Sequence, residues 1–311
     1  MNTRIYTDRI LSNVRSHLYS GKFKYITHPK FVFLCGKGID PNSSDRYEQT
    51  NRGIIGQYLK KMMPDVRIVL SESIWDQTFE ANIDLLSFEE FLAEVSDLII
   101  LFVESPGSFC ELGAFAYADK LFNDKMIIVM DQQYRDSKSF IASGPVLKAQ
   151  KENAKVIYAD IDHNMPMTSS ELLAALNQFI KMANEQRVLM NKREIGREQV
   201  KISSFIIEFL ELLRLFQPVS QDDLLSLYKQ IKEIDFFEFV KRDGQLFHQE
   251  IKLKYIINLL KTAELITQDE RGLRLVDYTQ TQQLMLNYEG YGIDSDRSKV
   301  LCRKYRYGEG I

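Results

Sequence analysis

The stretch LIILFVESPGSFCELGAF, residues 98–115, decides the fold class that this chain predicts. Its first six residues, 98–103, are all apolar, which is typical of a parallel strand covered on both faces. A Pro-Gly turn at 106–107 follows, and we expect a helix after it whose first turn carries Glu111. Because ligands in open α/β sheets bind beyond the carboxyl ends of the strands, the turn between Glu104 and Glu111 is the predicted binding site.

Strands and helices alternate through the first half of the chain. Four further apolar runs are predicted strands, at residues 31–36, 66–70, 126–130 and 155–158. Helices with regularly spaced apolar residues are predicted between them, at 44–63 and 86–95. Strands that alternate with helices of this size predict an α/β fold with a doubly wound parallel sheet.

The second half of the chain predicts a separate domain, and we expect residues 1–200 and 201–311 to form the two domains. A helix over residues 5–20 is expected to cap the first domain, and a long polar helix over 170–200 to end it. Beyond the boundary we predict helices near 202–216, from Ser220 and over 250–263, then two short strands at 265–276 around a polar turn. Helices followed by such a hairpin resemble a winged helix-turn-helix domain.

Composition excludes several classes of protein. A hydrophobic content of 45% and a charged content of 27% are those of a globular protein, and a net charge of −3 argues against a basic nucleic-acid coat protein. No stretch approaches the ~20 apolar residues of a membrane span, and the start lacks the apolar core of a secretory signal. We therefore expect a cytoplasmic protein that does not contact a membrane. The three cysteines are widely spaced and the four histidines form no ligand pattern, so we expect no disulfide, metal or other cofactor.

Carboxylates at the edge of a sheet suit the cleavage of a glycosidic bond. A carboxylate beside an anomeric carbon traps or stabilises the developing cation, and a second acid protonates or holds the leaving base. Glu111 also has a purely structural explanation. An acidic residue at a helix start interacts favourably with the helix dipole, which stabilises the helix by ~0.3–1 kcal/mol. The small residues on both sides of Glu111 favour the ligand site, because they let the helix and the strand approach closely.

The order of acidic residues here resembles the signature of nucleoside 2-deoxyribosyltransferases: Asp97, the strand, Glu104-Ser-Pro-Gly-Ser-Phe-Cys, then Glu111-Leu-Gly-Ala. The resemblance implies that Glu111 is the nucleophile or cation stabiliser, that Glu104 binds the base or ribose, and that Asp97 orients. It also implies that the end of the first strand receives the nucleoside. The residues expected to contact substrate are Cys35, Gly36, Ser105, Gly107, Ser108, Ser139 and Ser143. For the last two, an ordinary turn is the alternative.

Three blocks, at residues 33–36, 98–115 and 139–146, look like those of retron effector proteins, which are toxins encoded beside a retron reverse transcriptase. The resemblance implies an N-glycosidase that hydrolyses NAD or a related nucleotide. It also implies two partners that restrain the toxin until a phage trigger: the reverse transcriptase and msDNA, the retron's RNA-linked single-stranded DNA. Which nucleotide is cleaved, and whether the chain forms a homo-oligomer within the complex, stay open.

A basic and aromatic cluster near the C-terminus is a candidate nucleic-acid contact. Arg303, Lys304 and Arg306 alternate with Tyr305 and Tyr307, and such residues hold phosphates and stack bases. A packed tail is the alternative. Two other functions also stay open: a nucleotide sensor without catalysis, and a ligand-responsive DNA-binding regulator. Release of free base from NAD or nucleosides excludes the sensor, and sequence-specific duplex binding by the protein alone supports the regulator.

Overall fold

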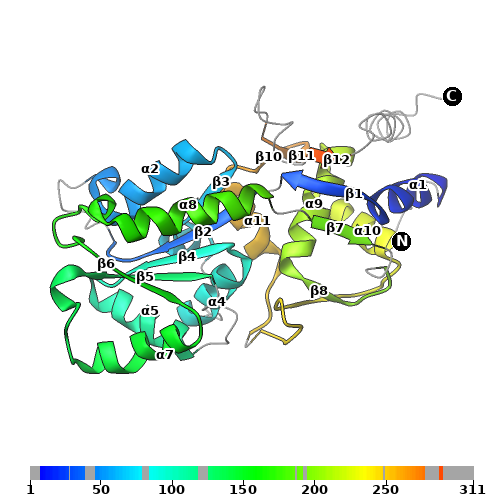
Figure 1. Cartoon of the computed structure of the whole chain (residues 1–311). Helices are drawn as coiled ribbons and strands as arrows, with labels where there is room; N and C mark the ends of the chain where they lie inside the picture. Colours follow the sequence, from blue (N-terminus) through cyan, green and yellow to red (C-terminus); the bar gives the residue numbers. More distant parts are fainter. Residues whose placement is uncertain are drawn as a thin grey trace. The chain divides into compact units, whose positions relative to one another are not determined.

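The computed structural model of this chain (Figure 1) describes residues 8–27, 29–38, 46–78, 84–117, 125–185, 188–191, 195–247, 249–276 and 287–289. The chain divides into two compact units. One consists of residues 29–184, and the other joins residues 1–28 to residues 185–311. The predicted first domain of residues 1–200 therefore differs from this division at both of its ends. Within the described residues, no helix combines the length and the apolar character that a membrane span requires.

A parallel sheet of five strands forms the centre of the 29–184 unit (Figure 1), in the order β3-β2-β4-β5-β6. All neighbouring strands pair in parallel. The strands are β2 (Lys30–Cys35), β3 (Val66–Val69), β4 (Leu98–Phe102), β5 (Met126–Asp131) and β6 (Lys155–Ala159). This order is that of a doubly wound sheet whose switch point lies between β2 and β4. The predicted α/β fold and all five predicted strands of this sheet are confirmed.

Helices cover both faces of this sheet (Figure 1). The apolar sides of α2 (Asn51–Met62) and α8 (Ser170–Glu185) share one core cluster with alternate residues of β2 and β4. On the other face, α4 (Leu85–Val95) contacts β2, and Phe115 of α5 (Pro106–Tyr117) packs edge-on against Phe33 of β2. The remaining helical segments are η1 (Tyr47–Gln49), α3 (Ser71–Thr78), η2 (Gln132–Tyr134), η3 (Ala142–Val146), α7 (Leu147–Lys151) and η4 (Pro166–Thr168).

The second unit contains helices and short strands. Its elements are α1 (Asp8–Leu18), β1 (Ser20–Thr27), β7 (Val188–Asn191), β8 (Gln199–Lys201), α9 (Ile202–Phe216), α10 (Gln221–Lys232), β9 (Glu238–Val240), α11 (Leu253–Thr262), β10 (Ile266–Asp269), β11 (Gly272–Leu275) and β12 (Asn287–Glu289). The predicted helices after residue 201 and the β10–β11 hairpin are confirmed. The prediction of one helix over 170–200 is wrong, because the chain leaves α8 at Glu185 and forms β7 and β8. These strands pair with β1 and β9, which lie far away in the sequence.

The N-terminal helix α1 belongs to this second unit. The guanidinium of Arg15 donates to the carbonyl oxygens of Gln230 and Ile231 in α10, both at 2.8 Å. The hydroxyl of Tyr19 donates to the buried carboxylate of Glu208 in α9 at 2.9 Å. The prediction that this helix caps the sheet domain is therefore wrong, because its polar and apolar residues find their partners on α9 and α10.

Candidate active site

Two serines build the connection between β4 and α5. Ser108 Oγ accepts the backbone N–H groups of Glu104 and Ser105 at 3.0 and 2.9 Å, and Ser105 Oγ accepts the N–H of Ser108 at 3.3 Å. Pro106 then takes the first helical position, where an absent N–H costs no hydrogen bond. The predicted Pro-Gly turn is therefore wrong, and so is the placing of Glu111 in the first helical turn. The helix starts earlier, and Glu111 lies in its second turn.

Glu104 closes the carboxyl end of β4 against the segments that follow β2. Its Oε1 accepts the backbone N–H of Lys37 at 3.0 Å, and its Oε2 accepts Nδ2 of Asn51 at 2.6 Å. Asn51 is fully buried, and the same Nδ2 donates to the carbonyl oxygen of Ile161 at 2.8 Å. Burial raises the pKa of Glu104, while the hydrogen bonds from Asn51 and Lys37 oppose that rise. Glu104 is thus fixed at the switch point between β2 and β4.

The end of β2, which is the predicted nucleoside-receiving position, lies against Glu104. Gly36 has a φ of +151°, and a Cβ there would lie 2.9 Å from Oε1 of Glu104 and 3.1 Å from Cβ of Phe102. A side chain at this position would therefore be strained and would displace the carboxylate. The preceding Cys35 is buried, and this burial raises the pKa of its thiol well above the usual value.

Glu111 lies close enough to a second buried carboxyl, Glu89 of α4, for their charges to interact. Glu89 is only 4% exposed, and its burial, followed by the charge of Glu111, raises its pKa to about 8. Burial also raises the pKa of Glu111 to about 7, with Arg52 opposing this rise and Glu72 adding to it. Among the described residues, Oε2 of Glu111 is buried without a hydrogen-bond partner. Both carboxyls therefore titrate near neutral pH, and the pair can hold one proton and one negative charge there.

An ion pair with one buried member, Arg52, acts on these carboxyls. The Nη2 and Nη1 atoms of Arg52 in α2 donate to the two carboxylate oxygens of Glu72 in α3, at 2.7 and 3.2 Å. The Arg52 side chain is 3% exposed, whereas that of Glu72 is 49% exposed. The positive charge of Arg52 acts on Glu104 and Glu111, where it partly offsets the rise in pKa that burial causes. The site therefore combines four groups. Glu89 and Glu111 are the carboxyls that titrate near neutral pH, Glu104 is the carboxylate fixed by hydrogen bonds, and Arg52 is the fixed cation.

Sequence reasoning found Glu104 and Glu111 but missed Asn51, Arg52, Glu72 and Glu89. A weak signal existed for Glu89, which lies three residues before Leu92 and four before Ala93 on a helix whose apolar face is buried. An acidic residue at such a position is a candidate for a perturbed pKa.

Asp97 does not join the other predicted catalytic residues. It lies before the amino end of β4, where its carboxylate accepts the N–H of Phe31 at 3.0 Å and its own N–H donates to the Phe31 carbonyl at 2.7 Å. Seven residue steps lie between Asp97 and Glu104, about 23 Å of extended chain at about 3.3 Å per residue. The structure therefore corrects the expected orienting role, because Asp97 ties β4 to β2 at the opposite edge of the sheet.

Other predicted contacts lie outside this cluster. Ser139 and Ser143 are exposed. The carbonyl of Ser139, three residues before η3, accepts the N–H of Ser143 at 3.0 Å, and η3 packs on α5. Gly107 is exposed in the first turn of α5. Contact of these residues with substrate stays a prediction. The predicted nucleic-acid contacts Arg303, Lys304 and Arg306 lie outside the described residues.

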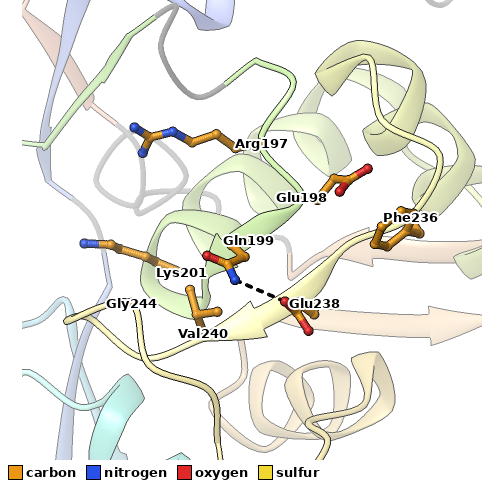
Figure 2. A pocket seen from close by; sticks show the side chains of 8 residues that line it. All are labelled: Arg197, Glu198, Gln199, Lys201, Phe236, Glu238, Val240 and Gly244. Atoms are coloured by element: carbon orange, nitrogen blue, oxygen red, sulfur yellow. Dashed lines mark hydrogen bonds between the residues drawn. The ribbon is translucent and has the colours of Figure 1, made fainter.

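The other unit has a hollow of about 550 Å³ beside β8 and β9 (Figure 2). Figure 2 shows Arg197 and Lys201 reaching to one side of it and Phe236 lying on the other, with Gln199 bonded to Glu238 between them. Glu198 and Glu238 balance the two cations, so the lining has no net charge to select a polyphosphate. We assign it no function.

Comparison with known proteins places the chain in a family. A family model described as "STM3845 retron effector protein" matches residues 48–268. The chain belongs to this retron effector family. One relative is the "Retron Ec86 putative ribosyltransferase/DNA-binding protein" of Escherichia coli, 32% identical over 277 residues, which are 87% of this chain and 84% of the relative. The protein of the same name from retron Ec73 of Escherichia coli is 37% identical over 123 residues, 38% of this chain and 37% of that protein.

The match to the retron effector family extends over parts of both units. It begins before Asn51, contains Glu89, Glu104 and Glu111, and continues to residue 268 in the second unit. The matched range therefore includes residues of the candidate site and most of the helices that follow it, and this chain is a retron-associated effector.

Proposed function

We propose that this retron effector is an N-glycosidase that hydrolyses NAD or a related nucleotide at the switch point between β2 and β4. The observation that carries the proposal is the pair formed by the partly buried Glu111 and the buried Glu89, whose pKa values are raised to about 7 and about 8. Such a pair supplies one carboxylate and one carboxylic acid near neutral pH. The word "ribosyltransferase" in the names of the two relatives also supports chemistry at an anomeric carbon.

In the proposed reaction, the bond between C1′ of the ribose and the base nitrogen breaks, and its electron pair leaves with the base. The Glu111 carboxylate attacks C1′ or stabilises its developing positive charge. A water molecule then adds its oxygen to C1′ and, where Glu111 has bonded to C1′, displaces the Glu111 carboxylate. The water loses one proton, which goes to solvent when the base leaves without a proton and back to Glu89 when Glu89 has protonated the base. Glu104, held by Lys37 and Asn51, keeps further lone pairs to accept hydrogen bonds from ribose hydroxyls.

The leaving group decides how much Glu89 contributes. Nicotinamide leaves NAD⁺ as a neutral molecule, because the pyridinium nitrogen takes the bonding electrons and needs no proton. Purine or pyrimidine bases leave more readily when an acid protonates them, and the protonated Glu89 can supply that proton. Replacing Glu89 with glutamine should therefore impair the cleavage of purine nucleosides more than the cleavage of NAD⁺.

We further propose that the second unit connects the enzyme to its retron. Three helices, α9, α10 and α11, followed by the β10–β11 hairpin, support a winged-helix-like domain within residues 201–311. The proposed partners are the reverse transcriptase and msDNA, with Arg303, Lys304 and Arg306 contacting nucleic acid. The words "DNA-binding protein" in the relatives' names are consistent with this assignment.

The test is to incubate the purified full chain with NAD⁺, with deoxynucleosides and with nucleotides, and to separate free bases by chromatography. The proposal expects release of nicotinamide from NAD⁺, or of a base from a related nucleotide. The matched control is Glu171→Gln, which makes the same change at an exposed residue of α8. Tight nucleotide binding without release of any base would replace the proposal with a nucleotide sensor.

A further inference from the structure

The guanidinium of Arg52 is committed to one partner. Both of its terminal nitrogens bind the carboxylate oxygens of Glu72, at 2.7 and 3.2 Å, in the two-pronged arrangement that arginine forms with carboxylates. Its remaining nitrogen, Nε, is buried and has no hydrogen-bond partner among the described residues. The charge of Arg52 acts on Glu111, but Oε2 of Glu111 has no hydrogen-bond partner among the described residues and so is not bound to the guanidinium.

The start of α2 fixes the backbone that carries Arg52. Thr50 caps this helix by accepting the N–H of Gly53 at 3.1 Å, and its hydroxyl donates to the carbonyl of Tyr47 at 2.7 Å. A Cβ on Gly53 would overlap that same carbonyl, so η1 and α2 are in direct backbone contact. Asn51 anchors the same turn to Glu104. Arg52 therefore projects from a rigid part of the site.

Charged and titratable groups on four elements interact electrostatically with Glu111. Cys35 comes from β2, Arg52 from α2, Glu72 from α3 and Glu89 from α4. Of these four, Arg52 carries a positive charge. A guanidinium released from Glu72 would have the buried, unpaired Oε2 of Glu111 as an alternative acceptor. Such a bond would stabilise the resting carboxylate and would oppose its action on an oxocarbenium ion.

We propose that Glu72 and Arg52 are a positioning pair for Glu111, in which Glu72 holds the guanidinium off the carboxylate so that it acts as a nearby counter-charge and not as a bound partner. This inference rests on the proposed function, since it assigns the pair to the reaction of Glu111. Neither residue touches the reacting atoms. Their effect is to set how readily Glu111 ionises and how free its carboxylate is.

The two partners should shift the ionisation of Glu111 in opposite directions. Glu72→Gln removes a negative charge and frees the guanidinium, so the acid limb of kcat/KM should move down by about one pH unit. This magnitude allows for solvent screening, because Glu72 is half exposed. With a limb near 7 in the wild type, activity at pH 6 relative to the plateau should rise about fivefold. The plateau of kcat itself should fall, because Arg52 then binds Glu111.

Arg52→Gln should move the same limb to higher pH, since it removes the counter-charge. The double variant should lie near the wild type, because the two effects oppose one another. Loss of structure alone would lower activity in both variants without opposite shifts. If Arg52→Gln does not fold, Arg52→Lys takes its place. Lysine keeps the positive charge but cannot form the two-pronged hydrogen bond, so this variant should shift the acid limb of kcat/KM less than Glu72→Gln does.

Carbon-13 NMR of glutamate carboxyls tests the pair without any substrate. The Glu111 signal is identified by its absence in Glu111→Gln, and its titration midpoint is then compared in wild type, Glu72→Gln and Arg52→Gln. Midpoints that move down and up respectively support the inference, whereas unchanged midpoints or shifts in one direction overturn it. An active Glu111→Gln enzyme would overturn the proposed function instead, so the two failures are distinguishable.

Discussion

Replacing Glu89 with glutamine is expected to stabilise the sheet-containing unit at alkaline pH. Burial raises the pKa of this carboxyl from its ordinary value of 4.5 to about 8, so the folded state binds more protons than the unfolded state across that interval. The free energy of unfolding of the wild type must therefore fall as the pH rises from 4.5 to 8. At 1.36 kcal/mol per pH unit, the loss approaches roughly 5 kcal/mol as an upper bound.

Glutamine has nearly the same shape as glutamic acid and never ionises, so the variant should lack this contribution. Glu89→Gln and wild type should have similar stability near pH 4.5, and the variant should become progressively more stable up to pH 8 and keep that advantage above it. A smaller dependence should persist in the variant up to about pH 7, because Glu111 also has a raised pKa. Glu90→Gln, the same change at the neighbouring, half-buried position of α4, should keep the wild-type dependence.

The single tryptophan of the chain makes the assay specific for this unit. Trp75 lies in α3, with its ring centroid 5.4 Å from that of Phe88, the residue next to Glu89. Its fluorescence during urea unfolding at pH 5, 7 and 9 therefore reports the packing around Glu89. The signal follows the unfolding of the 29–184 unit and not that of the other unit. Parallel stability curves for Glu89→Gln and wild type across this range would refute the claim that Glu89 is a buried acid.

Three further predictions concern activity and binding. The rate with a purine nucleoside should be bell-shaped in pH, falling below about 7 as Glu111 is protonated and above about 8 as Glu89 ionises, whereas with NAD⁺ the alkaline limb should be absent. Glu104→Gln should raise KM by about 10-fold or more and lower kcat less, because its carboxylate is assigned to binding, and initial-rate kinetics measure the split. Alanine in place of the three basic residues of the C-terminal cluster should weaken binding of msDNA and reduce the slope of log affinity against log salt by at most about 2, as fluorescence anisotropy at several salt concentrations would show. Those residues are Arg303, Lys304 and Arg306.

The central sheet could be predicted because a parallel strand covered on both faces must be apolar along its whole length. The runs 31–36, 98–103 and 126–130 meet that condition without reference to any other part of the chain. Glu104 and Glu111 were predictable for a related reason, because they follow one such strand directly.

The other half of the site depends on contacts between helices that the sequence separates. Arg52, Glu72 and Glu89 lie on three different helices, and Arg52 and Glu72 look like ordinary surface residues within their own helices. The starting point of α5 was missed because Pro106 reads as a turn, although proline is also favourable at the first position of a helix. The strand β7 was missed because its partner β1 comes some 160 residues earlier.

The most direct test of the central claim is free-base release by wild type and by Glu111→Gln at pH 7.5, measured on the same substrate and at equal concentrations of folded protein. The account predicts that the wild type releases base, and that the variant is slower by something on the order of 10²–10⁴-fold, because a neutral amide cannot stabilise an oxocarbenium ion. Unchanged fluorescence of Trp75 would show that the variant keeps its fold. A correctly folded Glu111→Gln protein that releases base at the wild-type rate would contradict the account.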